Sequence, residues 1–160
     1  MLTRKAKLSL SLAAAIPLLF AACQDNTLTG PYGDVAGTYQ LTVFQNATPP
    51  VTYTYSAGQI NALPNGGTLT WTDGTMVLNS NGTFTETNNY EVTPSGGQTT
   101  SSAFVSIGTF TVNGTEIDFS APPQNQASAR FFSGTIVSDR INYIEADGGV
   151  NYAYEYRSDV

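Results

Sequence analysis

Few side chains in this chain can do chemistry. Its 160 residues include one cysteine, Cys23, and no histidine, and the two lysines, Lys5 and Lys7, stand near the start. Without histidine, neither a Ser-His-Asp nor a Cys-His nucleophile system can form. What remains is carboxylate chemistry, or an oxygen-ligand cation site, built from twelve Asp and Glu residues.

Cys23 ends a pattern that directs proteins out of the cytoplasm. Three basic residues come first, and an apolar run of about fifteen residues, 8–22, leads up to the cysteine. The run is shorter than the ~20 residues that a membrane-spanning helix needs. A positive start, a short apolar middle and small residues at the end are the three parts of a signal peptide. We therefore predict that residues 1–22 are removed.

The four residues Phe20-Ala21-Ala22-Cys23 resemble the lipobox of bacterial lipoproteins. The resemblance implies that Cys23 becomes the first residue and carries several acyl chains, palmitate among them, which attach the protein to a membrane. Gln24 in place of aspartate resembles an outer-membrane lipoprotein, so we expect the outer membrane of the bacterial cell envelope. Two alternatives stay open: a free thiol in a secreted protein, and cleavage after Ala22 without lipid.

Removal of residues 1–22 makes the chain strongly acidic. Arg130, Arg140 and Arg157 then face twelve acids, a net charge of −9, and no lysine remains. Such a charge repels phosphate backbones, so nucleic acid is excluded as a partner. An acylated Cys23 leaves no thiol, and without lysine no Schiff base or Ser-Lys pair can form. We predict no enzyme activity, no catalytic residue, no cofactor and no metal site.

The rest of the chain divides into a tether and one domain. Residues 23–34 hold polar, Gly and Pro residues with little to bury, which predicts a lipidated N-terminus on a flexible tether. Residues 35–160 show no helical periodicity, and Thr, Tyr, Phe and Val alternate between frequent turn signals. The expected strands are 36–44, 51–55, 69–71, 76–78, 83–92, 99–112, 117–119, 127–137, 141–145 and 150–157.

Tight turns join most of these strands. Asp73-Gly74, Asn81-Gly82 and Asn113-Gly114 are short-hairpin signals, and Gly108 suggests a bulge within a long strand. On the first strand we expect Tyr39, Leu41 and Val43 to share a face. Consecutive hairpins give an antiparallel meander of eight to ten strands, which is stable as a sandwich or a closed barrel.

Several short segments, in their order, resemble the small bacterial lipocalin-like domains. They are Gly37-Thr38-Tyr39-Gln40-Leu41, Asn81-Gly82-Thr83-Phe84, Gly108-Thr109-Phe110-Thr111-Val112-Asn113-Gly114 and Tyr152-Ala153-Tyr154-Glu155-Tyr156-Arg157. The resemblance covers roughly residues 35–157. It implies an up-and-down antiparallel β-barrel of about eight strands, and it raises the question of a small-molecule cavity.

One departure from the larger lipocalins concerns how the barrel is closed. Those proteins carry Gly-x-Trp on the first strand, with an arginine of a late strand packed over the tryptophan. Here Tyr39 stands at that position. The resemblance makes Arg157 the first candidate for the covering arginine and Arg130 the second, through a cation–π contact with Tyr39.

Four aromatic residues are candidates for ligand binding. Tyr152, Tyr154 and Tyr156 alternate along one strand and share a face. They could line a pocket wall, or form a row packed in the core or against a neighbouring strand. Trp71, the only tryptophan, could cap the mouth of a cavity or anchor the core.

One further aromatic pair and one acidic pair are explained by ordinary strand structure. Phe131 and Phe132 are adjacent, so one should point inward and one outward. Glu116 and Asp118 alternate with apolar residues, a pattern typical of a solvated outer face rather than of a catalytic pair.

Three acids close to two late turns leave a calcium site open as an alternative. Asp139, Glu145 and Asp147 cluster in the sequence, although turns attract aspartate for their own reasons.

Two functions of different kind fit these observations. The first is a lipid-anchored envelope barrel that binds a small apolar or amphipathic molecule. The second is a structural or protein-interaction module with a filled barrel, no ligand and an unknown protein partner. A pocket of ~300 Å³ or more favours the first function.

Overall fold

The computed structural model describes residues 31–123, 129–147 and 150–158. The signal peptide, Cys23 and most of the tether lie outside the described residues. Lipid attachment and the cleavage site therefore stay predictions.

Within the described residues the chain forms nine strands and no helix. The strands are β1 (Gly37–Phe44), β2 (Val51–Ala57), β3 (Asn65–Leu78), β4 (Thr83–Pro94), β5 (Thr100–Asn113), β6 (Glu116–Ala121), β7 (Arg130–Val137), β8 (Arg140–Asp147) and β9 (Val150–Ser158). No helix of the described part is long and apolar enough to cross a membrane.

Eight strands close into an antiparallel barrel, as the sequence predicted. The sheet order is β1-β9-β8-β7-β6-β5-β4-β3-β2, and an additional pairing of β1 with β3 completes the ring. β1 pairs with β3 from Gly37↔Leu78 to Gln40↔Thr75. β2 stands outside the ring and pairs with the first half of β3. The barrel edge is thus removed, while β2 remains at the end of the sheet.

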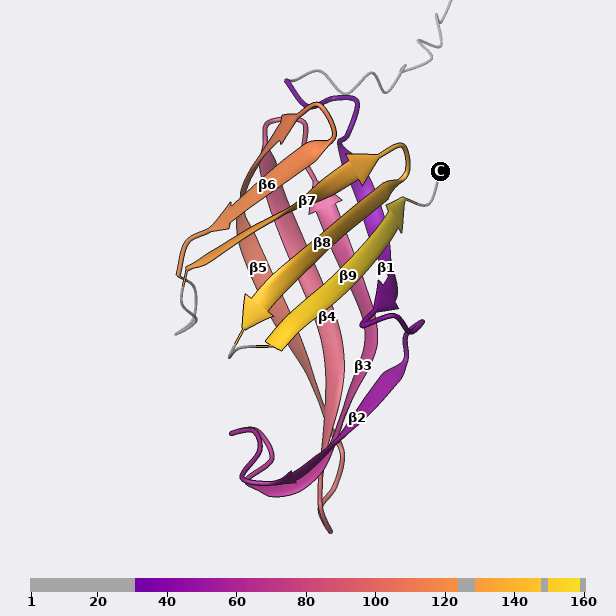
Figure 1. Cartoon of the computed structure of the whole chain (residues 1–160), viewed down its shortest axis with the longest axis vertical. Helices are drawn as coiled ribbons and strands as arrows, with labels where there is room; N and C mark the ends of the chain where they lie inside the picture. Colours follow the sequence, from indigo (N-terminus) through magenta and orange to yellow (C-terminus); the bar gives the residue numbers. More distant parts are fainter. Residues whose placement is uncertain (1–30, 124–128, 148–149, 159–160) are drawn as a thin grey trace, which may run out of the picture.

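The strands on the two sides of the barrel differ in length. β3, β4 and β5 have 14, 12 and 14 residues, whereas β6 to β9 have six to nine. The long strands continue past one mouth of the barrel and, together with β2, form a projecting sheet (Figure 1).

The expected turn at Asp73-Gly74 is wrong, because β3 runs straight through it. A register shift between Trp71 and Asp73 against β4 marks a bulge instead. An ideal Cβ on Gly74 would lie 2.2 Å from Asn88 Oδ1 and 3.0 Å from Leu41 Cβ. Gly74 therefore serves close packing inside the barrel and not a reversal of the chain.

Two further differences from the sequence prediction concern bulges: β1 contains one that was not predicted, and the one predicted at Gly108 is absent. β1 shifts register against β9 between Leu41 and Val43, so the buried side chain that follows Leu41 is Phe44 rather than Val43. Gly108 pairs regularly with Phe84, and β5 shows no register shift there. The turns predicted at Asn81-Gly82 and Asn113-Gly114 are confirmed by the hairpins β3–β4 and β5–β6.

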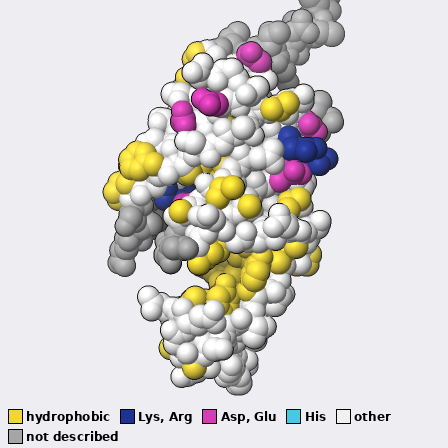
Figure 2. All heavy atoms as spheres, viewed as in Figure 1, with side chains coloured by type: hydrophobic (Ala, Val, Ile, Leu, Met, Phe, Trp, Pro, Cys, Tyr) yellow, Lys and Arg dark blue, Asp and Glu magenta, His cyan; other side chains and the backbone are white. Residues whose placement is uncertain are grey.

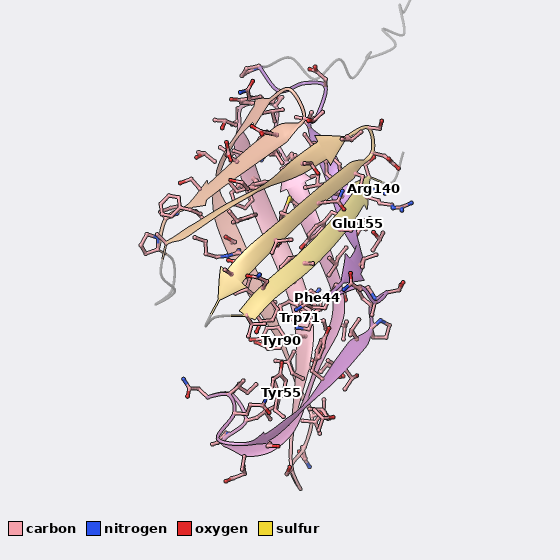
Figure 3. The ribbon with its side chains drawn as sticks, in the orientation of Figure 1. Phe44, Tyr55, Trp71, Tyr90, Arg140 and Glu155 are labelled. Carbon is pink, nitrogen blue, oxygen red and sulfur yellow. The ribbon has the colours of Figure 1, made fainter. Side chains whose placement is uncertain are left out.

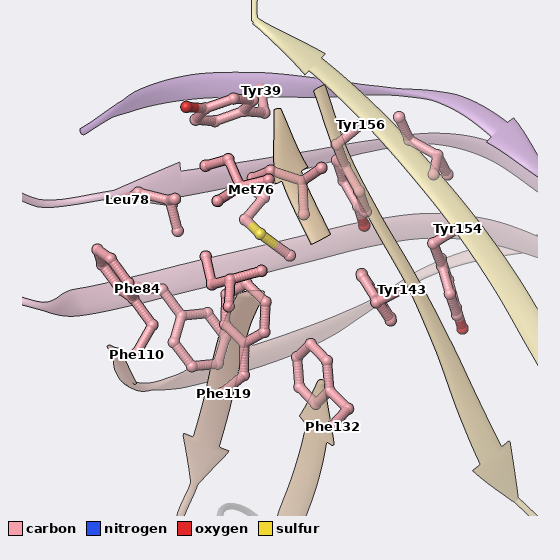
Figure 4. Close-up of a cluster of buried hydrophobic side chains, with 14 of the residues drawn as sticks. Tyr39, Met76, Leu78, Phe84, Phe110, Phe119, Phe132, Tyr143, Tyr154 and Tyr156 are labelled. Atoms are coloured by element: carbon pink, nitrogen blue, oxygen red, sulfur yellow. The ribbon is translucent and has the colours of Figure 1, made fainter. Parts of the chain in front are cut away.

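Side chains fill the interior of the barrel (Figure 4). The rings of Phe119 and Phe132 are stacked with centroids 4.6 Å apart, and Tyr143 and Tyr154 are stacked at the same distance. Phe132 is 5% exposed and Phe131 76% exposed, so the prediction of one inward and one outward phenylalanine is confirmed. The interior of the barrel is therefore a packed core.

Residues 31–34, which the sequence assigns to the tether, form a turn against the barrel. The backbone N–H of Tyr32 donates to Ser80 O at 3.3 Å, and the ring of Tyr32 lies 4.9 Å from that of Phe110. The described chain therefore enters at the end where the hairpin turns β3–β4 and β5–β6 lie (Figure 1).

Candidate functional site

A cleft of about 650 Å³ lies between the mouth of the barrel and the projecting sheet. Figure 2 shows the hollow, with hydrophobic side chains along its walls. This volume falls within the range of small-molecule sites. The lining residues are Tyr55, Ile60, Leu69, Trp71, Phe104, Ala129, Arg130, Phe131, Glu145, Ala146, Tyr152 and Tyr154. We call this feature the mouth cleft.

The projecting sheet contributes aromatic and aliphatic side chains from a single face. Trp71 pairs with Val51 on β2 and with Tyr90 on β4, and Leu69 pairs with Tyr53 and Val92. Cross-strand partners share a face, so this surface continues the inner face of the barrel beyond the shorter strands. Figure 3 shows Trp71 and Tyr90 at the junction and Tyr55 farther out on the projecting sheet.

The bulge in β3 decides that Trp71 points into the mouth cleft. After the bulge the inward residues are Gly74, Met76 and Leu78, all buried. Without the extra residue, regular alternation from these positions would turn Trp71 to the outer face. Asp73 fixes the bulge by accepting a 2.6 Å hydrogen bond from Asn89 Nδ2.

Phe44 lies beneath the aromatic side chains of the mouth cleft and is fully buried. Its ring centroid lies 4.7 Å from that of Trp71, 5.1 Å from Tyr154, 5.9 Å from Tyr53 and 6.1 Å from Tyr152. One ring thus connects the projecting sheet with the first half of β9. Aromatic contacts of this kind hold Trp71 and Tyr154 in fixed orientations.

Among the described residues that line the mouth cleft, Arg130 and Glu145 are the charged ones, and both lie on the barrel side. Arg130 Nε and Nη2 donate to the two oxygens of Glu145 at 2.7 and 2.6 Å. Arg130 Nη1 donates to Glu86 Oε2 at 2.8 Å. The guanidinium carbon also lies 4.7 Å from the ring centroids of both Phe104 and Phe132, so aromatic rings cover the group.

Glu86 is a fully buried carboxylate behind Arg130. Its Oε1 accepts hydrogen bonds from the Tyr143 hydroxyl and from Asn88 Nδ2. The Tyr156 hydroxyl lies 2.9 Å from the same oxygen and 2.8 Å from Asn88 Oδ1, and its proton can be donated to either. Every buried side-chain polar atom in the described part has a hydrogen-bond partner. The charge is therefore neutralised by an arginine and by converging donors.

These surroundings shift the pKa values of several side chains. Burial alone would lower the pKa of Arg130, but its hydrogen bonds to Glu145 and the attraction of Glu86 outweigh burial and raise it. Burial, followed by the negative charge of Glu86, raises the pKa of Tyr143, Tyr154 and Tyr156 above the ordinary tyrosine value. Arg130 thus stays charged, and these three hydroxyls stay protonated at neutral pH.

Three of the four predicted ligand-binding residues lie together. Trp71, Tyr152 and Tyr154 line the mouth cleft, while Tyr156 lies deeper, buried beside Glu86. Both interpretations of the tyrosine row, a pocket wall and a packed core row, therefore hold for different residues of the strand. Tyr156 belongs to the core, and Tyr152 lines the cleft. Tyr154 does both.

The predicted closure of the barrel by an arginine over Tyr39 is wrong. Arg157 pairs with Gln40, the neighbour of Tyr39, and so lies on the outer face, where it contacts Glu155 at 2.9 Å. Arg130 stacks on Phe104 and Phe132 instead. Tyr39 is buried, and its hydroxyl donates to Val35 O at 2.8 Å.

The described residues do not bring the late acidic side chains together as a calcium site would require. Asp139 lies in the turn before β8 and Glu145 near the end of that strand, so they lie at opposite ends of it. The described residues contain no group of three potential metal ligands among His, Cys, Asp and Glu. Glu116 and Asp118 are exposed on the outer face of β6, as the sequence predicted.

Sequence reasoning missed Phe44, Glu86, Asn88 and the pairing of Arg130 with Glu145. Phe44 was missed because the bulge in β1 reverses the alternation. Glu86 did leave a signal, since it follows Phe84 by two residues and so lies on the inward face of β4. A carboxylate in an apolar alternation predicts a buried charge that needs a partner.

Comparison with known proteins adds little to this description. No family model and no curated protein matches the chain. Among solved structures the chain is similar to a mutant of the fluorescent protein UnaG, with 10% sequence identity and a TM-score of 0.32. That match covers 78% of this chain and 96% of the other. The fold assignment accordingly rests on the strand pairings.

Proposed function

We propose that this protein is a non-enzymatic binding protein that holds a small apolar or amphipathic molecule in the mouth cleft. The observation that carries the proposal is the cleft itself: about 650 Å³, lined largely by aromatic and aliphatic side chains around one paired charge. Such a lining is typical of small-molecule sites. The ligand site is the mouth of the barrel, because the barrel interior is packed with side chains.

We further propose that lipid on Cys23 anchors the protein to the outer membrane of a bacterial envelope. The support is the basic start, the short apolar run and the Phe20-Ala21-Ala22-Cys23 segment. Labelled palmitate should enter the protein and be absent from Cys23→Ser. The variant should leave the membrane fraction. Equal membrane attachment of both proteins would contradict the anchor.

A survey of native ligands tests the binding function. The chain carrying Cys23→Ser is incubated with envelope extract, purified again, and analysed for bound small molecules by mass spectrometry. A Trp71→Ala, Tyr152→Ala double variant, whose folded state is first verified by circular dichroism, serves as the control because it removes two aromatic side chains of the mouth cleft. We expect one or a few compounds on the first protein and at least ~10-fold less on the control. No compound, or equal amounts on both, would overturn the function.

An interaction module is the second candidate, and one observation favours it. Phe131 and Ile144 are 76% and 61% exposed on the outer faces of neighbouring strands β7 and β8. Exposed apolar side chains that lie close together mark contact surfaces. Photo-crosslinking from position 144 in cells should capture one reproducible protein if this function holds. A smear of unrelated proteins, equal to that from exposed Asp118, would remove it.

A further inference from the structure

We infer that the mouth cleft selects ligands with a positively charged head, such as alkyl or aryl ammonium compounds, over ligands with a carboxylate head. The inference rests on the proposed function and specifies the chemical class of its ligand. It follows from the charges that line the cleft, from how Arg130 is occupied, and from the kind of side chain that remains available.

Arg130 is the only cation among the described residues that line the cleft, and its hydrogen bonds are already made within the protein. Three of its five N–H groups face the carboxylates of Glu86 and Glu145 at 2.6 to 2.8 Å. Phe104 and Phe132 lie over the guanidinium. A ligand carboxylate would have to displace Glu145 from a bidentate pair, which is a strong form of charged hydrogen bond. Arg130 is therefore a poor anchor for an anion.

No other positive charge of the described residues can replace it. Arg140 and Arg157 both contact Glu155, at 3.7 and 2.9 Å, on the outer face of the barrel. Within the cleft cluster, one guanidinium faces two carboxylates, Glu86 and Glu145. The side chain of Glu145 is 19% exposed, so its negative charge acts on a ligand bound in the cleft. A cationic head meets attraction there and an anionic head meets repulsion.

Aromatic faces provide the second contribution. Tyr55, Trp71, Tyr152 and Tyr154 line the cleft, and the electron-rich faces of such rings attract ammonium groups. The acidic chain as a whole, with a formal net charge of −6 before any processing, also favours the approach of cations over anions.

Three ligands, each built on a chain of ten carbons, separate the contribution of the head group from that of the apolar body. Decyltrimethylammonium, decanoate and decanol are titrated at pH 7.5 and low salt into the Cys23→Ser chain, with the fluorescence of Trp71, the only tryptophan, as the readout. We expect the ammonium compound to bind ~10-fold or more tightly than decanoate, with decanol between them. Equal or tighter binding of decanoate overturns the inference and leaves the proposed function standing. If none of the three changes the fluorescence, both fail.

A matched pair of charge variants tests the origin of the preference. Glu145→Gln removes the partly exposed carboxylate of the cleft, and Glu116→Gln removes one exposed carboxylate on the outer face of β6. We expect Glu145→Gln to reduce the preference for the ammonium compound at least ~3-fold and Glu116→Gln to leave it unchanged. An equal effect of both variants would assign the preference to net charge and overturn the inference. Should Glu145→Gln not fold, the three-ligand comparison on the Cys23→Ser chain decides.

Discussion

Glu86 occupies a position that strand alternation reserves for a core side chain. It lies between Phe84 and Asn88 on the inward face of β4 and is fully buried. A lone buried carboxylate is costly, but here Arg130 neutralises it and tyrosine hydroxyls and an amide donate to it. The barrel interior is therefore divided into an apolar part and a polar part that reaches the mouth cleft.

Replacing Glu86 tests how much this arrangement matters. Glu86→Ala removes one of the three hydrogen bonds of Arg130 and the acceptor of the Tyr143 hydroxyl, so we expect a loss of about 3–5 kcal/mol in the free energy of unfolding. Glu86→Gln keeps the shape and one acceptor and should cost less. Urea denaturation measures both. Exposed Glu116→Ala is the control, expected within about 0.5 kcal/mol of the parent. Equal losses for the alanine variants would refute the role of Glu86.

Phe44 is the aromatic residue on which the floor of the mouth cleft depends. Phe44→Ala removes contacts with four rings of three other strands. We expect a loss of about 3–5 kcal/mol, together with a red shift of Trp71 fluorescence as water reaches the indole. Val137→Ala, at a residue that is 54% exposed and does not line the mouth cleft, should change neither quantity. An unshifted Trp71 spectrum in folded Phe44→Ala would contradict this account.

At the scale of the strands, local signals predicted the meander but not its irregularities. Two Asn-Gly turns were correct, because only a short hairpin satisfies that dipeptide between alternating strands. The Asp73-Gly74 signal failed because Gly74 packs closely against Asn88 of β4 and Leu41 of β1, the two strands that flank it, and these residues are distant in sequence. Bulges have the same long-range origin, and they decide which face Trp71 and Phe44 present.

The candidate site was predictable to the extent that regular alternation holds. Tyr152 and Tyr154 on β9 were placed on one face from the sequence, and they lie together in the mouth cleft. The pairing of Arg130 with Glu145 and Glu86 could not be predicted, because it joins three strands through barrel closure. Which long strands project beyond the mouth depends likewise on the whole set of pairings.

Gly108 offers a test of close strand packing. A Cβ at this position would lie 2.1 Å from Ser120 O and 2.8 Å from Ala121 Cα, both backbone atoms of β6. Gly108→Ala must therefore move β5 and β6 apart, and we expect a loss of at least about 2 kcal/mol in unfolding free energy. Gly37→Ala, whose nearest neighbour would be 3.8 Å away, is the control and should be neutral. Equal stability of the two variants would contradict the packing.

The molecule as a whole has two unlike ends. The described chain enters through a turn packed on Phe110 and hydrogen-bonded to Ser80, whereas the mouth cleft opens towards the other end of the barrel (Figure 2). If Cys23 holds the proposed lipid, the anchored segment joins the barrel away from the cleft.

The buried tyrosines make the stability of the whole molecule sensitive to alkaline pH. The pKa values of Tyr143, Tyr154 and Tyr156 are raised in the folded protein, chiefly by burial. A raised pKa means that the folded state keeps the proton after the unfolded state has released it. The free energy of unfolding is therefore constant in this respect below pH ~10, the ordinary tyrosine value, and falls as pH rises above it.

We expect that fall to reach at most about 1.4 kcal/mol per pH unit for each tyrosine that remains protonated. Urea unfolding at pH 9, 10 and 11 measures it, while near-ultraviolet absorbance follows tyrosinate formation. Tyr143→Phe removes one of the three groups and should reduce the slope by up to one proton. Tyrosinate absorbance should appear in two steps, with the buried hydroxyls ionising only as the barrel unfolds. The charge of Glu86 and the packed interior oppose ionisation of the buried hydroxyls in the folded state. Ionisation of all nine tyrosines near pH 10 in a protein that is still folded would therefore contradict this account.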